Sequence, residues 1–148
     1  LLRSVFEIRN LMAGVERDSY LGLKPTNGAT ARIAVQFYPC GAGRMNLHRD
    51  PTGTHQAVVC LLVMSEAGTD YKEGGLVVEH GIKYHPEFDC APGDLIWLSP
   101  DVIHGVSPVD PNHSIGWKGF RGRWAALLAT NRLSPVSDIP NSKNFGKS

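Results

Sequence analysis

Two histidines and one aspartate are the residues of this sequence whose types and spacing best suit metal chemistry. His48 and Asp50 flank Arg49, and residues i and i+2 of a strand point to the same face. His104 follows the apolar segment "DLIWLSPDVI" and is the best candidate for a third ligand. Two histidines and one carboxylate on one face of an ion form the facial triad of non-haem Fe(II) oxygenases, which leaves positions open. These residues predict an iron site, with Arg49 facing away from it; the alternative is a polar pair at the end of a strand.

The elements that must position these residues read as a helix followed by strands. Apolar residues recur at helical spacing over residues 1–23, and "KPTNG" then breaks the pattern. Six short β-rich segments follow, bounded by Gly, Pro, Asp or Asn and without interleaved helices: "ARIAVQFY", "QAVVCLLVM", "GGLVVEH", "DLIWL", "IHGVSPV" and "RWAALLAT". This pattern is typical of an antiparallel sandwich or barrel preceded by a helix. We therefore expect one domain over residues 1–133, with a helix over 1–23 and a β-core over 31–131, and a polar tail or linker over 134–148.

Composition narrows the class of protein. The 148 residues are 42% hydrophobic and 20% charged, with a net charge of +1. The overall electrostatic field therefore does not favour binding to nucleic acid or to an anionic membrane. The longest apolar run, residues 57–64, is too short to span a bilayer, and we expect no membrane partner. Three widely spaced cysteines argue against a disulfide framework and favour a reducing cytoplasmic or nuclear compartment. The chain begins without Met inside the expected helix, which is typical of a domain cut from a longer protein.

Several motifs occur in a specific order along the chain. They are Tyr38 at a strand end, His48-x-Asp50, the apolar strand "AVVCLLVM", Gly74-Gly75, Pro92-Gly93-Asp94, His104 and Arg123-Trp124. In this order, residues 31–130 resemble the double-stranded β-helix core of Fe(II)/2-oxoglutarate-dependent dioxygenases, most of all their prolyl-4-hydroxylase-like branch. The resemblance implies a mainly β, jelly-roll core with a flanking N-terminal helix, and Fe(II) held by His48, Asp50 and His104.

The resemblance also implies 2-oxoglutarate as cosubstrate and dioxygen as co-reactant, with ascorbate in support. Arg123 would bind the far carboxylate of the cosubstrate, because a buried carboxylate needs a fixed partner and a guanidinium offers two parallel donors. Arg121 is the competitor, since on a strand it shares a face with Arg123; a solvated charge at the strand start is the structural alternative. Tyr38 resembles the family tyrosine whose hydroxyl reaches the same cosubstrate, and a core aromatic is its alternative reading. The expected reaction is hydroxylation of a substrate C–H bond, with succinate and carbon dioxide as coproducts.

The substrate and two rival functions remain open. A peptidyl or amino-acid substrate follows from the prolyl-hydroxylase likeness. A nucleobase is the second choice, since "FYPCGAGRMNLHRD" is also similar to AlkB-type demethylases and "HRD" to the TET and J-binding-protein base oxidases; against AlkB, position 129 is Ala129 where a second arginine is expected. A cupin-type metal-binding protein would share the fold, although its first motif would usually carry His at position 50. A metal-free jelly-roll binding module is the third reading.

Overall fold

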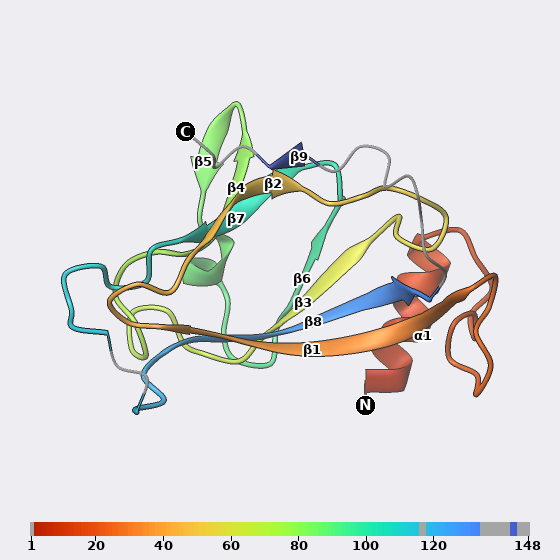
Figure 1. Cartoon of the computed structure of the whole chain (residues 1–148), viewed down its shortest axis with the longest axis horizontal. Coiled ribbons are helices and arrows are strands. Elements are labelled where there is room, and N and C mark those ends of the chain that lie inside the picture. The colour runs from red at the N-terminus through yellow and green to blue at the C-terminus, as the bar shows by residue number, and fades with distance from the viewer. Residues whose placement is uncertain (1, 116–117, 134–142, 145–148) are drawn as a thin grey trace.

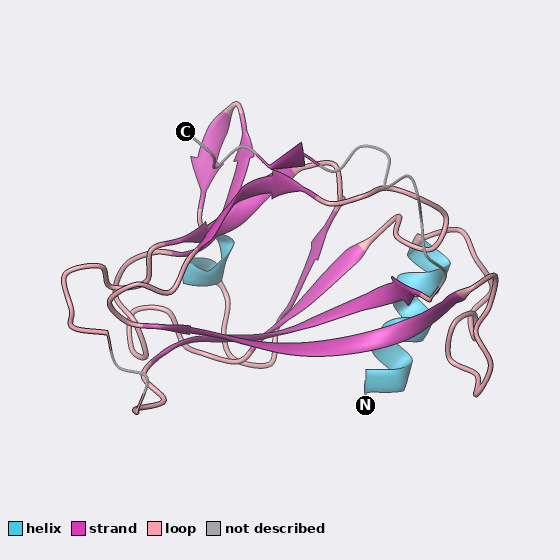
Figure 2. Ribbon diagram, viewed as in Figure 1, coloured by secondary structure: helices cyan, strands magenta, loops and turns pink. Residues whose placement is uncertain are grey.

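The chain folds into two antiparallel β-sheets that pack against each other (Figures 1 and 2). The computed structural model describes residues 2–115, 118–133 and 143–144. One sheet has the strand order β1-β8-β3-β6 and the other β5-β4-β7-β2-β9. The strands are β1 (Ala29–Pro39), β2 (Met45–Arg49), β3 (Val59–Val63), β4 (Gly75–His80), β5 (Ile82–Tyr84), β6 (Leu95–Leu98), β7 (Ile103–Ser107), β8 (Gly122–Arg132) and β9 (Lys143–Asn144). The expectation of a mainly β fold is confirmed.

The first eight strands pair in a nested pattern. β1 pairs with β8, β2 with β7, β3 with β6 and β4 with β5, all antiparallel. The chain therefore runs outward to the β4–β5 hairpin and returns alongside itself. A consequence for function is that β2 and β7, which are distant in sequence, become neighbours.

The core between the two sheets comes from alternate residues of their strands. Leu61, Val63 and Ile96 of the four-stranded sheet form one buried cluster with Leu76 of β4, and Val78 packs against it. Val78 lies directly opposite His104 in the β4–β7 ladder, and directly opposed residues share a face of the sheet. His104 therefore faces the interior between the sheets.

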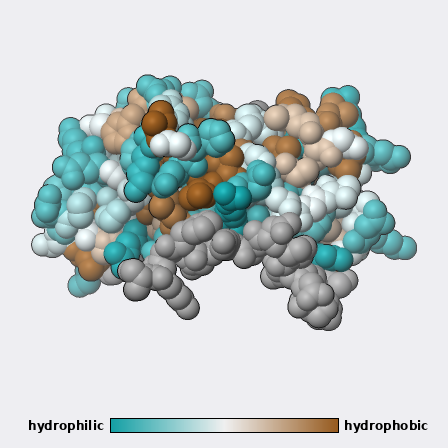
Figure 3. All heavy atoms as spheres, turned by 90° about the horizontal axis from the view of Figure 1, so that it is seen from above, coloured by the Kyte–Doolittle hydropathy of each residue, from teal (hydrophilic) through white to brown (hydrophobic). Residues whose placement is uncertain are grey.

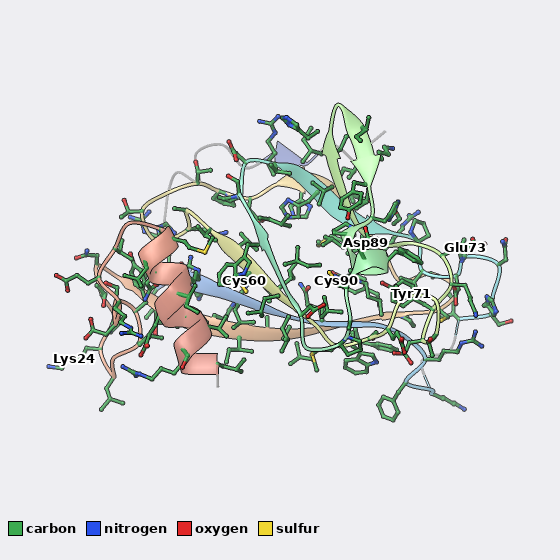
Figure 4. All side chains as sticks on the ribbon, turned by 180° about the vertical axis from the view of Figure 1, so that it is seen from behind. Lys24, Cys60, Tyr71, Glu73, Asp89 and Cys90 are labelled. Carbon is green, nitrogen blue, oxygen red and sulfur yellow. The ribbon has the colours of Figure 1, made fainter. Side chains whose placement is uncertain are left out.

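The helix α1 (Leu2–Met12) covers the outer face of the four-stranded sheet. Val5 and Phe6 form a buried cluster with Cys60, Ala126 and Leu128, and Cys60 lies beside the helix in Figure 4. The helix fills an otherwise exposed apolar sheet face, which is the role expected for a flanking helix.

The prediction that the helix extends to residue 23 is wrong beyond Met12. The amide of Gly14 donates to the Leu11 carbonyl and that of Val15 to the Asn10 carbonyl, while Gly14 has φ +71°. These bonds form a Schellman motif, in which a left-handed glycine ends the helix. Asn10 then holds the returning segment, since its side-chain amide donates to the carbonyls of Arg17 and Ser19.

The six expected strands are all present. The described residues also form three strands, β2, β5 and β9, that the apolar runs do not predict. Only the His-x-Asp spacing indicates β2. β5 follows β4 across a turn at Gly81, and β9 pairs with β2. Residues 143–144 of β9 belong to the segment expected to be a tail, and the rest of that segment lies outside the described residues. Within the described ranges, no helix has the length and apolar character that crossing a membrane requires.

Candidate functional site

The structure brings His48, Asp50 and His104 together. His48 near the end of β2 lies directly opposite His104 on β7, with ring centroids 4.4 Å apart. Asp50 follows β2 and lies between the rings: its Oδ1 is 3.6 Å from His48 Nε2 and its Oδ2 is 3.6 Å from His104 Nε2. One donor atom from each residue falls within 4.8 Å of the others. Arg49, between the two ligand candidates, is exposed.

Backbone carbonyls orient both imidazoles. His48 Nδ1 lies 2.8 Å from the Asn46 carbonyl oxygen, and His104 Nδ1 lies 2.9 Å from that of Val102. A carbonyl only accepts hydrogen bonds, so each Nδ1 carries a proton. In the neutral imidazole, Nε2 then has the free lone pair, and metal-binding histidines are commonly held in this way by their other nitrogen. Both Nε2 atoms face the Asp50 carboxylate, each 3.6 Å from one of its oxygens.

Asp50 is held in place and ionised. Its amide donates to the Pro100 carbonyl over 2.8 Å. Burial alone would raise the pKa of Asp50, but hydrogen bonds and charge interactions with His104 and His48 outweigh it and lower that pKa. The Asp50 hydrogen bond in turn raises the pKa of His48. The group thus combines an anionic carboxylate with two histidine side chains.

The group of three lies at the boundary between core and surface. The His104 side chain is 5% exposed, whereas those of His48 and Asp50 are 20% and 25% exposed. Figure 3 looks onto the side of the molecule where β5, β4 and β2 lie, and hydrophilic side chains there adjoin apolar ones. His48 and Asp50 are thus partly open to solvent, while His104 lies in the interior.

Arg123 and Arg121, the two candidates for a carboxylate partner, have opposite environments. Arg123 lies on β8 with its side chain 1% exposed. It shares a face of β8 with Leu127, which packs into the core between the sheets. Arg121 precedes the strand, is 58% exposed, and its Nη2 lies 4.0 Å from Asp110 Oδ2. Only Arg123 is in the interior.

A glutamate that sequence reasoning did not identify already pairs with Arg123. Glu87 lies on the short 3-10 helix η1 (Pro86–Asp89). Arg123 Nε donates to both Glu87 oxygens over 2.8 Å, and Nη2 lies 2.7 Å from Oε1. Glu87 Oε2 also accepts from the Tyr71 hydroxyl at 2.7 Å and from the Leu76 amide at 2.9 Å. We call these four groups the Arg123 cluster; in Figure 4, Tyr71 lies below η1, near the labelled Asp89.

The charge state of the Arg123 cluster follows from these contacts. Burial would raise the pKa of Glu87, but the hydrogen bond and charge of Arg123, with the bonds from Leu76 and Tyr71, outweigh it and lower that pKa. Burial raises the pKa of Tyr71, and the charge of Glu87 adds to the rise. The cluster is thus a carboxylate–guanidinium pair with a neutral phenol.

Tyr38 lies against the guanidinium and not on Glu87. It is the cross-strand neighbour of Arg123, and the Arg123 Cζ lies 5.1 Å from its ring centroid, within the range of cation–π attraction. Its hydroxyl contacts Met45 Sδ at 3.6 Å. Tyr38 therefore helps to hold Arg123 from the β1 side.

The Gly74-Gly75 pair permits the close approach expected of it. A Cβ on Gly75 would lie 2.7 Å from both Glu87 Oε2 and the Tyr71 hydroxyl, and one on Gly74 would lie 2.1 Å from the Pro108 carbonyl oxygen. Both residues have positive φ, +86° and +82°. The glycines thus leave room for the Arg123 cluster and for the chain that follows β7.

The Arg123 cluster lies close to the three metal-binding candidates. The Leu76 amide belongs to the cluster, and Leu76 is paired with Val106, two residues along the ladder from the Val78–His104 pair. Two residues of a strand span about 7 Å. The Leu76 amide that binds Glu87 is thus two residues along β4 from the residue opposite His104.

Sequence reasoning missed Glu87 and Tyr71 for a physical reason. A buried arginine needs hydrogen-bond acceptors, and a carboxylate is the strongest of them. Nothing in "YHPEFDC" distinguishes Glu87 from the chain's other acids. Tyr71 stands in the polar segment 65–73, and yet it is fully buried.

Comparisons with known proteins add no relative. No protein-family model matches the chain, and no curated protein matches it significantly.

Proposed function

We propose that this chain is an Fe(II)- and 2-oxoglutarate-dependent dioxygenase of the prolyl-4-hydroxylase-like branch, with a double-stranded β-helix core. The observation that carries the proposal is the convergence of one donor atom each from His48, Asp50 and His104 within 4.8 Å. Two imidazoles and one carboxylate are the donor set of the facial triad. The backbone bonds to both Nδ1 atoms fit this role, since they leave each Nε2 available to a metal.

The strand pairing supports the proposed core. Four nested antiparallel pairs, divided between two facing sheets, are what a jelly roll requires. In such a fold the inner faces of both sheets line the interior, and His104 and Arg123 come from opposite sheets. A ligand between the sheets would contact one group from each.

Each residue has a role in the proposed reaction. His48, Asp50 and His104 would hold Fe(II), which with 2-oxoglutarate and dioxygen supplies hydroxylation of a C–H bond and releases succinate and carbon dioxide. Arg123 would bind the far carboxylate of 2-oxoglutarate, with Tyr38 holding the guanidinium from one side. The protein orients these partners and limits access of water.

For the prime substrate, we favour a peptidyl or amino-acid C–H bond on the strength of the resemblance. Ala129, where an AlkB-type second arginine would stand, is a small buried residue, which speaks against that nucleobase class. A TET-like base oxidase remains a candidate to screen with modified oligonucleotides.

The Glu87–Arg123 pair favours a second candidate function. A cupin-type protein would bind metal through the same three residues and need no free arginine for a cosubstrate. Because Glu87 already neutralises Arg123, this alternative predicts metal binding without any response to 2-oxoglutarate. A metal-free binding module would respond to neither.

Anaerobic titration with Fe(II) and then 2-oxoglutarate tests the proposal. We expect the weak visible metal-to-ligand charge-transfer band, its loss in Asp50→Ala, and its retention in Arg49→Ala, the exposed neighbour that serves as control. Metal binding without the band would favour the cupin-type function. No metal binding by folded protein would overturn both.

A further inference from the structure

The guanidinium of Arg123 has two edges, and the protein occupies only one of them. Nε and Nη2 bind Glu87 side-on. Nη1 lies on the adjacent, end-on edge, is buried, and has no hydrogen-bond partner within the described part of the chain. A buried donor without a partner is costly, and the side chain is 1% exposed. A second acceptor at this edge would satisfy it.

The chemistry of that edge selects an anion. Guanidinium N–H groups bind carboxylates with charge-assisted hydrogen bonds, and the Tyr38 ring contacts the cation without supplying an anion. One arginine can bridge two carboxylates, one on each edge. The second carboxylate, however, would be repelled by the first.

We propose that Glu87 is the residue that sets the affinity of this site for a dicarboxylate: it fixes Arg123 from one edge and opposes, by its charge, the ligand carboxylate that binds Nη1 at the other. The inference rests on the proposed function for the identity of the ligand, 2-oxoglutarate. Glu87 is thus a specificity-determining residue that does not touch the metal candidates.

The contacts of Glu87 hold its carboxylate beside Arg123, and its charge can be removed by substitution. Its carboxylate is held by the Tyr71 hydroxyl and the Leu76 amide as well as by Arg123, so it stays beside the guanidinium when a ligand arrives. In Glu87→Gln, one oxygen can keep those two donors, while the new NH₂ group faces the Arg123 donors and cannot pair with them. Arg123 then has a full charge available to a ligand.

The expected size of the effect follows from Coulomb's law. Two carboxylates on the two donor edges of one guanidinium lie about 6 Å apart, and at an effective dielectric constant of about 20 their repulsion changes affinity by on the order of a hundredfold. Removal of the Glu87 charge should tighten binding of a dicarboxylate by about that factor. A ligand without the distal carboxylate should be unaffected.

Calorimetric titration of Mn(II)-loaded protein tests this role. The probes are 2-oxoglutarate and 2-oxopentanoate, which has the same chain length but a methyl group in place of the distal carboxylate. We expect Glu87→Gln to bind 2-oxoglutarate on the order of a hundredfold more tightly than wild type, with 2-oxopentanoate unchanged. Glu87→Asp keeps the charge on a shorter side chain, so its affinity for 2-oxoglutarate should lie between those of wild type and Glu87→Gln. It replaces Glu87→Gln if that variant does not fold.

Two results would overturn the proposal. One is unchanged or weaker binding of 2-oxoglutarate in Glu87→Gln, which would mean that Glu87 only positions Arg123. The other is equal tightening for both probes, which would place the effect at the metal end. Titration of metal-free protein with glutarate separates this proposal from the proposed function. If Glu87→Gln binds glutarate more tightly while wild type shows no charge-transfer band, the Arg123 site stands without the dioxygenase.

Discussion

Replacement of Gly75 by alanine should destabilise the protein through the Arg123 cluster. Gly75 has φ +82°, and a Cβ there would lie 2.7 Å from Glu87 Oε2 and from the Tyr71 hydroxyl. Neither atom can move freely, because both side chains are buried and bonded to each other. The added methyl group must therefore disturb the hydrogen bonds that hold Glu87 against Arg123.

The expected cost has two parts. Left-handed backbone costs an L-residue about 1–2 kcal/mol, and overpacking of a tight interior costs typically about 1–3 kcal/mol. Gly75→Ala should thus lower the free energy of unfolding by about 2–5 kcal/mol. For a domain of this size, each kcal/mol shifts Tm by roughly 3–4 °C.

Gly81→Ala is the matched control. Gly81 has a similar φ of +77°, but a Cβ there has no neighbour within 4 Å, so it carries the backbone cost alone. Urea unfolding followed by circular dichroism measures both variants, with unchanged m-values as the sign that only stability has changed. Equal destabilisation of the two variants would refute the close packing of Gly75 on the cluster.

Three further predictions follow from the same contacts. Arg123→Met should lower the free energy of unfolding by about 3–5 kcal/mol, because it leaves the buried Glu87 charge without its partner. Adding Glu87→Gln should recover part of this loss. If urea unfolding shows that the effects of the two substitutions simply add, Glu87 and Arg123 do not stabilise each other. The stability advantage of wild type over Glu87→Gln should be full above the unfolded-state pKa of about 4.3 and should shrink as the pH falls, because the folded-state pKa of Glu87 is lowered. A difference in unfolding free energy that does not change with pH would refute the lowered pKa. Alkylation of the native protein at pH 8, followed by mass spectrometry, should modify the partly exposed Cys90 first and the buried Cys60 last, since burial raises the pKa of the Cys60 thiol to about 11; early modification of Cys60 would contradict the packing of α1 over β3.

The strands and the metal candidates could be predicted because local signals determine them. Apolar runs bounded by turn residues located β1, β3, β4, β6, β7 and β8, and the two-residue period of a strand placed His48 and Asp50 on one side. The pairing of β2 with β7, which brings His104 to them, is non-local and was not predicted.

The remaining features depend on contacts that no local pattern encodes. The helix end required attention to Gly14, whose left-handed conformation outweighs the apolar spacing after it. β9 exists because β2 offers it an edge, and its own two residues carry no strand signal. Glu87 pairs with Arg123 across the interior, and the identity of a buried arginine's partner is decided by the fold as a whole.

A crystal structure with Mn(II) and 2-oxoglutarate tests the central claim most directly. Mn(II) is detected by its anomalous scattering and stands in for Fe(II) without reacting with dioxygen. The account predicts one strong peak bound by His48 Nε2, an Asp50 oxygen and His104 Nε2, with the distal carboxylate of 2-oxoglutarate at Arg123 Nη1. A folded protein with no peak at these three atoms, or with Mn(II) bound elsewhere, would contradict it.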